Sequence, residues 1–157
     1  MAGAGRGPPV IDGVTVRPLH RFRDARGQVL KMLEATDPEF RGFGEVYFST
    51  VRPGAVKAWR RSPAWRSYRV VHGAIRLVLA DRRAGSPTHG ALDEIAMDDD
   101  HDVLVQIPPG VWSGFTGLGS LESIVCDLTD RPSAAGGVEK LEPDDAAIGY
   151  DWHARRT

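Results

Sequence analysis

The 157-residue chain has one cysteine, Cys126, and no long apolar run. A single cysteine excludes an internal disulfide and every cysteine-rich zinc module. A transmembrane helix needs about 20 consecutive apolar residues, and the N-terminus lacks the apolar core of a signal peptide, so the sequence predicts a cytoplasmic protein that does not enter a membrane. Lysine and arginine total 20 against 21 acidic residues, which leaves no overall positive charge to attract nucleic acid.

Glycine and proline are plentiful, with 18 and 11 residues scattered along the chain. They separate short apolar runs, a pattern typical of strands rather than long helices. Residues 27–35 fit a helix or a strand, and we favour a strand. The clearest strand candidates are residues 45–52, 68–72, 74–80, 102–107 and 121–128. Many short strands with turn signals about every 8 to 12 residues predict an all-β sandwich, barrel or jelly roll.

The length and composition also predict how the chain is divided. The first nine residues are almost entirely Gly, Ala, Pro and Arg, a composition that buries too little apolar surface to fold. We therefore expect a disordered leader over residues 1–9 and a single domain over residues 10–157.

The usual motifs of catalysis are absent. The sequence has no GxxxxGK[ST] phosphate loop, no GxSxG nucleophile turn, no HExxH and no GxGxxG after a strand. A metal-binding cupin needs two histidines one residue apart, with a carboxylate and a later histidine. The five histidines, at positions 20, 72, 89, 101 and 153, show no such spacing. Because histidine is the commonest metal ligand, the sequence predicts no metal, and it gives no sign of another cofactor.

Cationic and aromatic residues are concentrated between Lys57 and Arg69. Arginine beside tryptophan suits a planar anionic ligand, because guanidinium groups bind phosphates in pairs of hydrogen bonds and the rings stack. The alternative interpretation is a basic surface loop with two half-buried tryptophans. The cluster alone does not choose between them.

Six segments, in the same order, resemble the dTDP-4-dehydrorhamnose 3,5-epimerase family. They are FRDARG (22–27), GAVK (54–57), HGAIRLVLADRR (72–83), SPTHG (86–90), IPPGVWSGF (107–115) and IGYDW (148–152). The family is a metal-free cupin that is usually a homodimer. The resemblance therefore implies an all-β cupin, a jelly-roll β-barrel sandwich with short flanking segments, and a homodimer.

The resemblance also assigns residues to ligand contacts. Phe22 matches the aromatic residue that stacks on thymine, and Arg26 matches an arginine that contacts the diphosphate. Lys57 stands where the family has a substrate-contacting arginine, and Arg66 where it has a lysine near the sugar. These four positions imply a nucleotide-sugar site, and we expect Trp59, Arg60, Trp112 and Ser113 to complete its substrate contacts.

The catalytic positions of the family are filled by other residue types. Its histidine base falls at Arg60, or at Ser62 in an alternative register, and a second histidine falls at Ser113. Its tyrosine acid falls at Arg131 or Pro132. Arginine stays protonated far above neutral pH and an isolated serine is no base, so the sequence predicts that the catalytic residues are replaced.

The sequence therefore predicts an epimerase-family cupin that binds a small anionic metabolite, a nucleotide-linked deoxysugar, with the ordinary 3,5-epimerase chemistry lost or altered. One alternative is a cyclase or isomerase of secondary metabolism that acts on a polyketide-type intermediate, with Trp59, Trp65 and Trp112 lining its pocket. Another is a non-catalytic partner subunit of a second sugar-modifying enzyme. Whether the protein is an enzyme stays open at this point.

Overall fold

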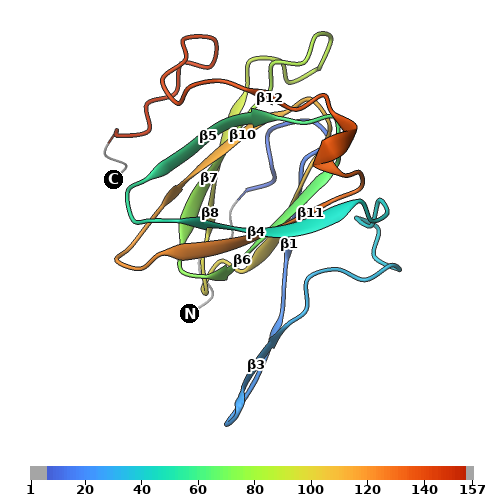
Figure 1. Cartoon of the computed structure of the whole chain (residues 1–157), viewed down its shortest axis with the longest axis vertical. Coiled ribbons are helices and arrows are strands. Elements are labelled where there is room, and N and C mark those ends of the chain that lie inside the picture. Colours follow the sequence, from blue (N-terminus) through green and yellow to red (C-terminus); the bar gives the residue numbers. More distant parts are fainter. Residues whose placement is uncertain (1–6, 155–157) are drawn as a thin grey trace.

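Two five-stranded sheets pack face to face, and a two-stranded hairpin projects from one end of them (Figure 1). This computed structural model describes residues 7–154. Of the leader expected over residues 1–9, residues 1–6 lie outside the described part. The all-β fold expected from the sequence is confirmed. Within the described residues, the one helical element is a short 3₁₀ turn, Ser133–Ala135.

Each sheet contains strands from distant parts of the chain. The first sheet has the order β1 (Thr15–Pro18), β9 (Val103–Ile107), β6 (Arg66–His72), β11 (Ser123–Thr129) and β4 (Glu45–Val51). The second has the order β12 (Glu139–Lys140), β5 (Val56–Arg61), β10 (Trp112–Gly117), β7 (Ile75–Ala80) and β8 (Leu92–Met97). Consecutive strands mostly lie in opposite sheets, which is the arrangement of a jelly roll.

The five strand candidates of the sequence are confirmed as β4, β6, β7, β9 and β11, with ends that differ by up to two residues. The strand favoured within residues 27–35 is present as β3 (Gly27–Leu30). Within residues 7–154, no helix is long and apolar enough to cross a membrane.

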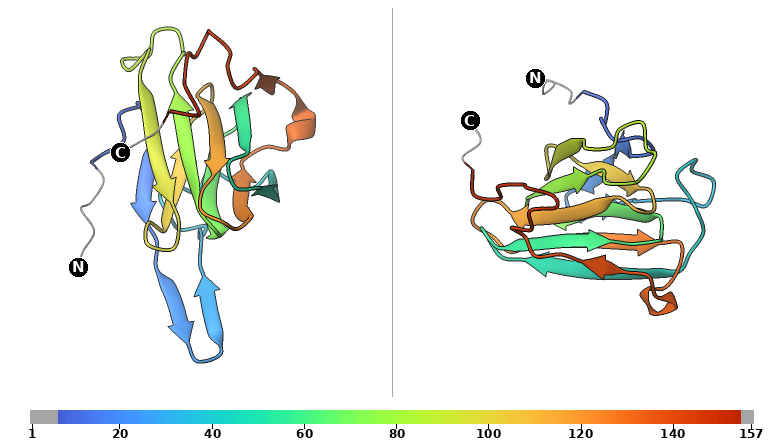
Figure 2. Two further views of the ribbon diagram at one scale, coloured as in Figure 1. Left: turned by 90° about the vertical axis from the view of Figure 1, so that its left-hand side faces the viewer. Right: turned by 90° about the horizontal axis from the view of Figure 1, so that it is seen from above.

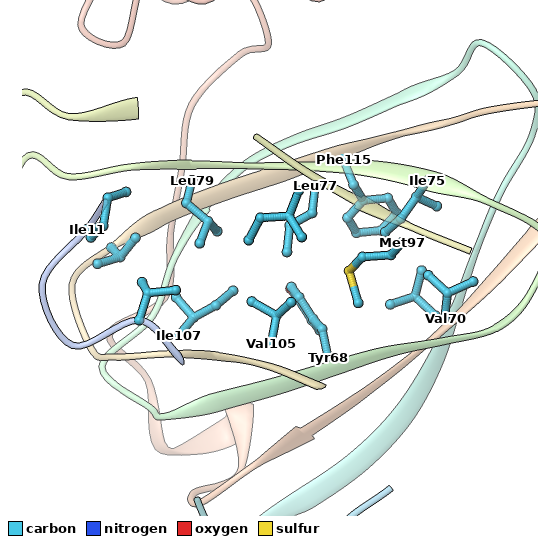
Figure 3. Packing of buried hydrophobic residues seen from close by; sticks show 14 of the residues in the cluster. Ile11, Tyr68, Val70, Ile75, Leu77, Leu79, Met97, Val105, Ile107 and Phe115 are labelled. Atoms are coloured by element: carbon cyan, nitrogen blue, oxygen red, sulfur yellow. The ribbon is translucent and has the colours of Figure 1, made fainter. Parts of the chain in front are cut away.

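Apolar side chains fill one end of the space between the sheets. Leu77 and Leu79 of β7 face Val105 and Ile107 of β9 across this space (Figure 3). Successive side chains of a strand point to opposite faces, so the alternation along residues 75–80 directs every second residue inward. The core leaves the β4–β11 and β5–β10 end of the sandwich for other side chains.

A second apolar cluster covers the outer face of the second sheet. Ile148, Tyr150 and Trp152 of the C-terminal segment pack there with Trp59 and Trp112. The Trp59 ring nitrogen also donates a hydrogen bond to the Pro143 carbonyl at 3.2 Å. The segment 141–152 therefore acts as a strap that holds β5 and β10 from outside.

The hairpin of β2 (Arg21–Asp24) and β3 extends away from both sheets (Figures 1 and 2). Its base is fixed by Arg21, whose Nε donates to Asp102 Oδ2 at 2.6 Å. Its apolar side chains Phe22 and Val29 are exposed. The hairpin thus presents an apolar surface outside the sandwich.

Candidate functional site

A cavity of about 340 Å³ opens between the sheets, between strands β4, β6 and β11 on one wall and β5 and β10 on the other. This volume lies within the range of small-molecule sites. The wall of the first sheet contributes Tyr47, Ser49, Arg66, Tyr68, Val125 and Asp127. The opposite sheet contributes Lys57, Ala58, Trp59, Arg60, Ser113, Gly114, Phe115 and Lys140.

A chain of hydrogen bonds links the two walls. Arg66 Nε and Nη2 donate to Asp127 Oδ2 at 3.2 and 2.9 Å, and Arg66 Nη1 donates to Ser113 Oγ at 2.9 Å. The Tyr47 hydroxyl donates to the same Asp127 oxygen at 2.6 Å and accepts a hydrogen bond from Arg60 Nη1 at 3.0 Å. Arg60 and Ser113 come from the second sheet, so the network spans the cavity.

The inner part of the cavity is polar but carries little net charge. Arg66 and Asp127 form a salt bridge whose side chains are 4% and 1% exposed. Burial raises the pKa of Tyr47 to about 12, and the adjacent Asp127 carboxylate adds to the rise. The phenol therefore stays protonated at neutral pH and acts as a neutral hydrogen-bond partner.

The outer edge of the cavity is positively charged. Lys57 and Lys140 line the cavity and are exposed, and Lys140 pairs in the sheet with Arg60. Lys57 Nζ donates to Ser49 Oγ at 2.9 Å. Arg60 Nη2 donates to Ser133 Oγ at 3.3 Å. Three cations at one opening suit an anionic group such as a phosphate, which accepts charge-assisted hydrogen bonds.

Five of the eight residues that the sequence assigned to substrate contacts line this cavity: Lys57, Trp59, Arg60, Arg66 and Ser113. Of the two positions considered for the family's histidine, Arg60 lines the cavity. Ser62 instead lies in the turn after β5, where its Oγ accepts a hydrogen bond from the Ala64 amide at 3.1 Å.

The other three assigned residues lie away from the cavity in this chain. Phe22 and Arg26 belong to the projecting hairpin, and Arg26 pairs with Asp24 at 2.6 Å. Trp112 packs in the outer cluster because its neighbour Ser113 takes the inward position on β10. Trp59 touches the cavity, yet it belongs to the same outer cluster.

Tyr47, Asp127 and Lys140 are site residues that the sequence interpretation missed. Asp127 has a recognisable signal, because a single carboxylate stands within the apolar run of β11. Tyr47 has the inward position on β4 opposite Asp127. The alternation of side chains along a strand predicts that it points inward, but does not distinguish a site residue from a core tyrosine. Lys140 lies in a two-residue strand, which is too short to show an alternation of apolar and polar residues.

Metal ligands do not gather at this site or elsewhere in the described chain. Within residues 7–154, no group of three or more His, Cys, Asp or Glu side chains is placed to hold a metal ion. The asymmetry of the sandwich, with an apolar core at one end and a ligand-sized cavity at the other, defines the protein as a cupin-type jelly roll.

The sequence profile of dTDP-4-dehydrorhamnose 3,5-epimerase matches residues 9–157, so the chain belongs to this family. It is 31% identical to "Probable low-salt glycan biosynthesis epimerase Agl13" of Haloferax volcanii, over 91% of this chain and 90% of the relative. It is 30% identical to the spore coat polysaccharide biosynthesis protein SpsL of Bacillus subtilis, over 92% of this chain and 97% of the relative.

Solved structures agree with this assignment. The crystal structure of a dTDP sugar isomerase from Desulfovibrio desulfuricans G20 is similar with a TM-score of 0.91 and 35% identity, over 96% of this chain and 98% of that one. ChmJ, a 3'-monoepimerase from Streptomyces bikiniensis in complex with dTDP-quinovose, has a TM-score of 0.80 and 21% identity, over 92% and 77% of the two chains. At that identity ChmJ supports the fold alone.

Proposed function

We propose that the protein binds a nucleotide-linked deoxysugar in this cavity, acting in the cytoplasm in glycan biosynthesis or secondary metabolism. The observation that carries the proposal is the charge distribution. Lys57, Arg60 and Lys140 form a cationic outer edge, and the inner part is neutral and rich in hydrogen-bonding groups. A diphosphate suits the outer edge, and the hydroxyl and carbonyl groups of a sugar suit the inner part.

The relatives support the same class of ligand. The relative from Desulfovibrio desulfuricans, at 35% identity, is described as a dTDP sugar isomerase, and two structures with the same fold contain dTDP-quinovose and dTDP-4-keto-L-rhamnose. Of the three tryptophans that the polyketide alternative requires as a pocket lining, Trp59 contacts the cavity, whereas Trp65 and Trp112 do not.

In this proposal the ordinary two-residue epimerase chemistry is altered. Arg60, one of the two positions that the resemblance assigns to the family's histidine, lines the cavity, and a guanidinium cannot take a proton near neutral pH. Arg60 then serves as an anion-binding group. It is held in place by its hydrogen bonds to Tyr47 and Ser133.

Isothermal titration with dTDP and dTDP-quinovose tests the proposed ligand class. We expect binding by the wild-type protein. The Lys57→Gln and Lys140→Gln variants should each bind about 3- to 10-fold more weakly, which corresponds to about 0.7–1.4 kcal/mol per lost phosphate contact. Absence of binding at millimolar ligand, or unchanged affinity in both variants, would contradict the proposal.

The proposal includes a homodimer in which the hairpin serves the site of the other copy. Phe22 and Arg26 are exposed. They belong to the β2–β3 hairpin, which extends away from both sheets of its own chain (Figure 2). Phe48 and Val46, on the outer face of the edge strand β4, are exposed as well. A second copy would cover this apolar surface and bring the hairpin to a cavity.

Light scattering and complementation test the dimer. We expect the mass of two chains in solution and weak dTDP binding by the Arg26→Ala and Lys57→Gln variants. Mixed dimers of the two variants should regain one site of wild-type affinity, because one copy supplies Arg26 and the other supplies Lys57. A monomer, or a mixture without restored binding, would refute the shared site.

A further inference from the structure

The carboxylate able to accept a proton near neutral pH in this cavity lies on the wall formed by the first sheet. Asp127 is the single carboxylate that lines the cavity in the described chain, and the hydroxyl of Tyr47 lies beside it. Both project from the first sheet, where Asp127 on β11 pairs with Tyr47 on β4. The opposite wall offers groups that are not bases near neutral pH, namely Lys57, Arg60, Lys140 and Ser113.

The hydrogen bonds of Asp127 involve one of its two oxygens. Oδ2 accepts from Arg66 and Tyr47, whereas the buried Oδ1 has no hydrogen-bond partner among the described residues. A buried acceptor without a partner is uncommon in a folded protein, and it often marks a functional role. The carboxylate is thus fixed at one oxygen and keeps acceptor capacity at the other.

Donors for a developing negative charge stand next to this carboxylate. The Arg66 guanidinium donates to Asp127 and to Ser113, so these three groups form one cluster. As a donor, the Ser113 hydroxyl makes a long contact of 3.4 Å to the Arg60 carbonyl, so its proton is able to turn toward a ligand oxygen. Guanidinium and hydroxyl donors beside a carboxylate base are the parts of a site that forms an enolate.

We propose that Asp127 is a catalytic residue that transfers protons at one face of a bound keto sugar, next to the carbonyl group. This inference rests on the proposed function, since it takes the nucleotide-linked sugar as ligand. Inversion of a carbon centre requires a proton acceptor on one face and a donor on the other. The carboxylate stands on one wall, and the lysines of the opposite wall lie at the outer edge that the proposed function assigns to the diphosphate. This arrangement favours proton removal and return on the same face.

The proposed step needs only the ligand and the Asp127 carboxylate, which exchange one proton. The bond between the carbon next to the carbonyl and its hydrogen breaks, and the proton joins Asp127. The electron pair forms a carbon–carbon double bond, and the carbonyl oxygen becomes an enolate that accepts hydrogen bonds from Arg66 and Ser113. Return of the proton to the same carbon restores the ketone. If the hydroxyl on the deprotonated carbon instead gives its proton to the former carbonyl oxygen, Asp127 returns its proton to the former carbonyl carbon, and the ketone then stands at the carbon that was deprotonated.

Deuterium exchange tests this inference separately from ligand binding. The protein is incubated in D₂O with dTDP-4-keto-L-rhamnose, and proton NMR follows deuterium next to the carbonyl and the configuration of the labelled carbon. We expect incorporation with retained configuration. Inversion of that carbon, or no incorporation above the protein-free rate at a saturating ligand concentration, would overturn the inference. Failure to bind the ligand at all would instead refute the proposed function.

Substitutions identify the group that moves the proton. Asp127→Asn should reduce exchange to the protein-free rate, while calorimetry still detects the ligand. Ser113→Ala keeps the Arg66–Asp127 pair and should slow exchange at least about tenfold, because an enolate donor is lost. Asp144→Asn, the same change at an exposed site outside the cavity, should exchange at the wild-type rate. Wild-type exchange in Ser113→Ala or in a folded Asp127→Asn protein would overturn the assignment.

Discussion

At the scale of single residues, Asp102 ties the hairpin to the first sheet. Its carboxylate accepts hydrogen bonds from Arg21 Nε at 2.6 Å and from Arg69 Nε and Nη2 at 2.9 and 2.5 Å. The side chains of Arg69 and Arg21 are 0% and 6% exposed. Because both guanidinium groups are buried, water cannot replace the carboxylate as their partner. An unpaired buried charge destabilises a fold strongly.

The Asp102→Asn variant is expected to lose about 3–5 kcal/mol of unfolding free energy, because the fully buried Arg69 loses its carboxylate partner and Arg21 keeps Asp99 alone. Urea titration followed by tryptophan fluorescence measures the loss. Glu139→Gln breaks the partly exposed pair with Arg61 and should cost at most about 1 kcal/mol. Equal losses in the two variants would show that burial does not set the energy of these pairs.

Asp81 couples stability to pH. Burial tends to raise the pKa of Asp81, but hydrogen bonds from Arg83, Ser86 and Thr88 outweigh burial and hold it well below its usual range. The three donors lie 2.8, 2.6 and 2.7 Å from Asp81 Oδ2. The folded-state pKa is lower than the unfolded one, so this network stabilises the fold above about pH 4 and loses its effect as the pH falls through the folded value.

The Asp81→Asn variant is therefore expected to be less stable than wild type at neutral pH, with a difference that shrinks below about pH 4. Thermal unfolding at about pH 7, about pH 4 and about pH 2.5 measures this difference. Asp144→Asn, an exposed carboxylate, serves as the matched control. A difference from wild type that stays constant down to the lowest pH would contradict the assigned role of the Asp81 carboxylate.

At the scale of elements, strand β10 depends on a glycine in the middle of the second sheet. A Cβ atom at Gly114 would lie 2.5 Å from the Ala58 Cβ and 2.9 Å from Trp152 Cζ2. Here β5 and the C-terminal strap approach the β10 backbone more closely than any side chain allows. The same contact fixes β5, which carries Lys57 and Arg60 at the cavity.

Gly114→Ala is expected to destabilise the protein by about 1–3 kcal/mol, because the added methyl overpacks the junction of β5, β10 and the strap. Chemical denaturation measures the loss, and dTDP binding should weaken with it as β5 shifts. Gly7→Ala adds the same methyl where no atom lies within 4 Å, so it controls for the substitution itself. A Gly114→Ala protein of wild-type stability would show that this junction can relax.

At the scale of the whole molecule, the net charge and the charge at the edge of the cavity have opposite signs. The formal net charge is -1, yet three cations line the outer edge of the cavity. Attraction of an anionic ligand must then arise at short range from these side chains. Salt screens such exposed charges, with a Debye length of about 8 Å at physiological ionic strength.

Affinity for dTDP is therefore expected to fall about 3- to 10-fold between about 50 and about 500 mM NaCl, because salt screens the cationic edge. Calorimetric titration at several salt concentrations measures the effect. Thymidine, which lacks the diphosphate, should bind with little salt dependence. Equal salt dependence for both ligands would contradict binding of the diphosphate at Lys57, Arg60 and Lys140.

The sequence by itself determined the fold class and most strands of this protein. Alternation along residues 75–80 indicates which side chains of that strand point into the core, and glycine and proline indicate where strands end. These signals are local, so a single sequence shows them without any knowledge of tertiary contacts. The resemblance added the order of the segments, and with it the jelly roll and cavity positions such as Lys57 and Arg66.

Only the tertiary structure decided which side chains share the cavity. Tyr47, Arg66 and Asp127 come from three strands that are far apart in sequence, and pairing in one sheet brings them within hydrogen-bond distance. The fold also placed Phe22 and Trp112 away from this cavity, one on the hairpin and one beneath the strap. Strand pattern specifies which face a residue occupies, whereas the neighbours on that face depend on register and sheet order, which form over long sequence separations.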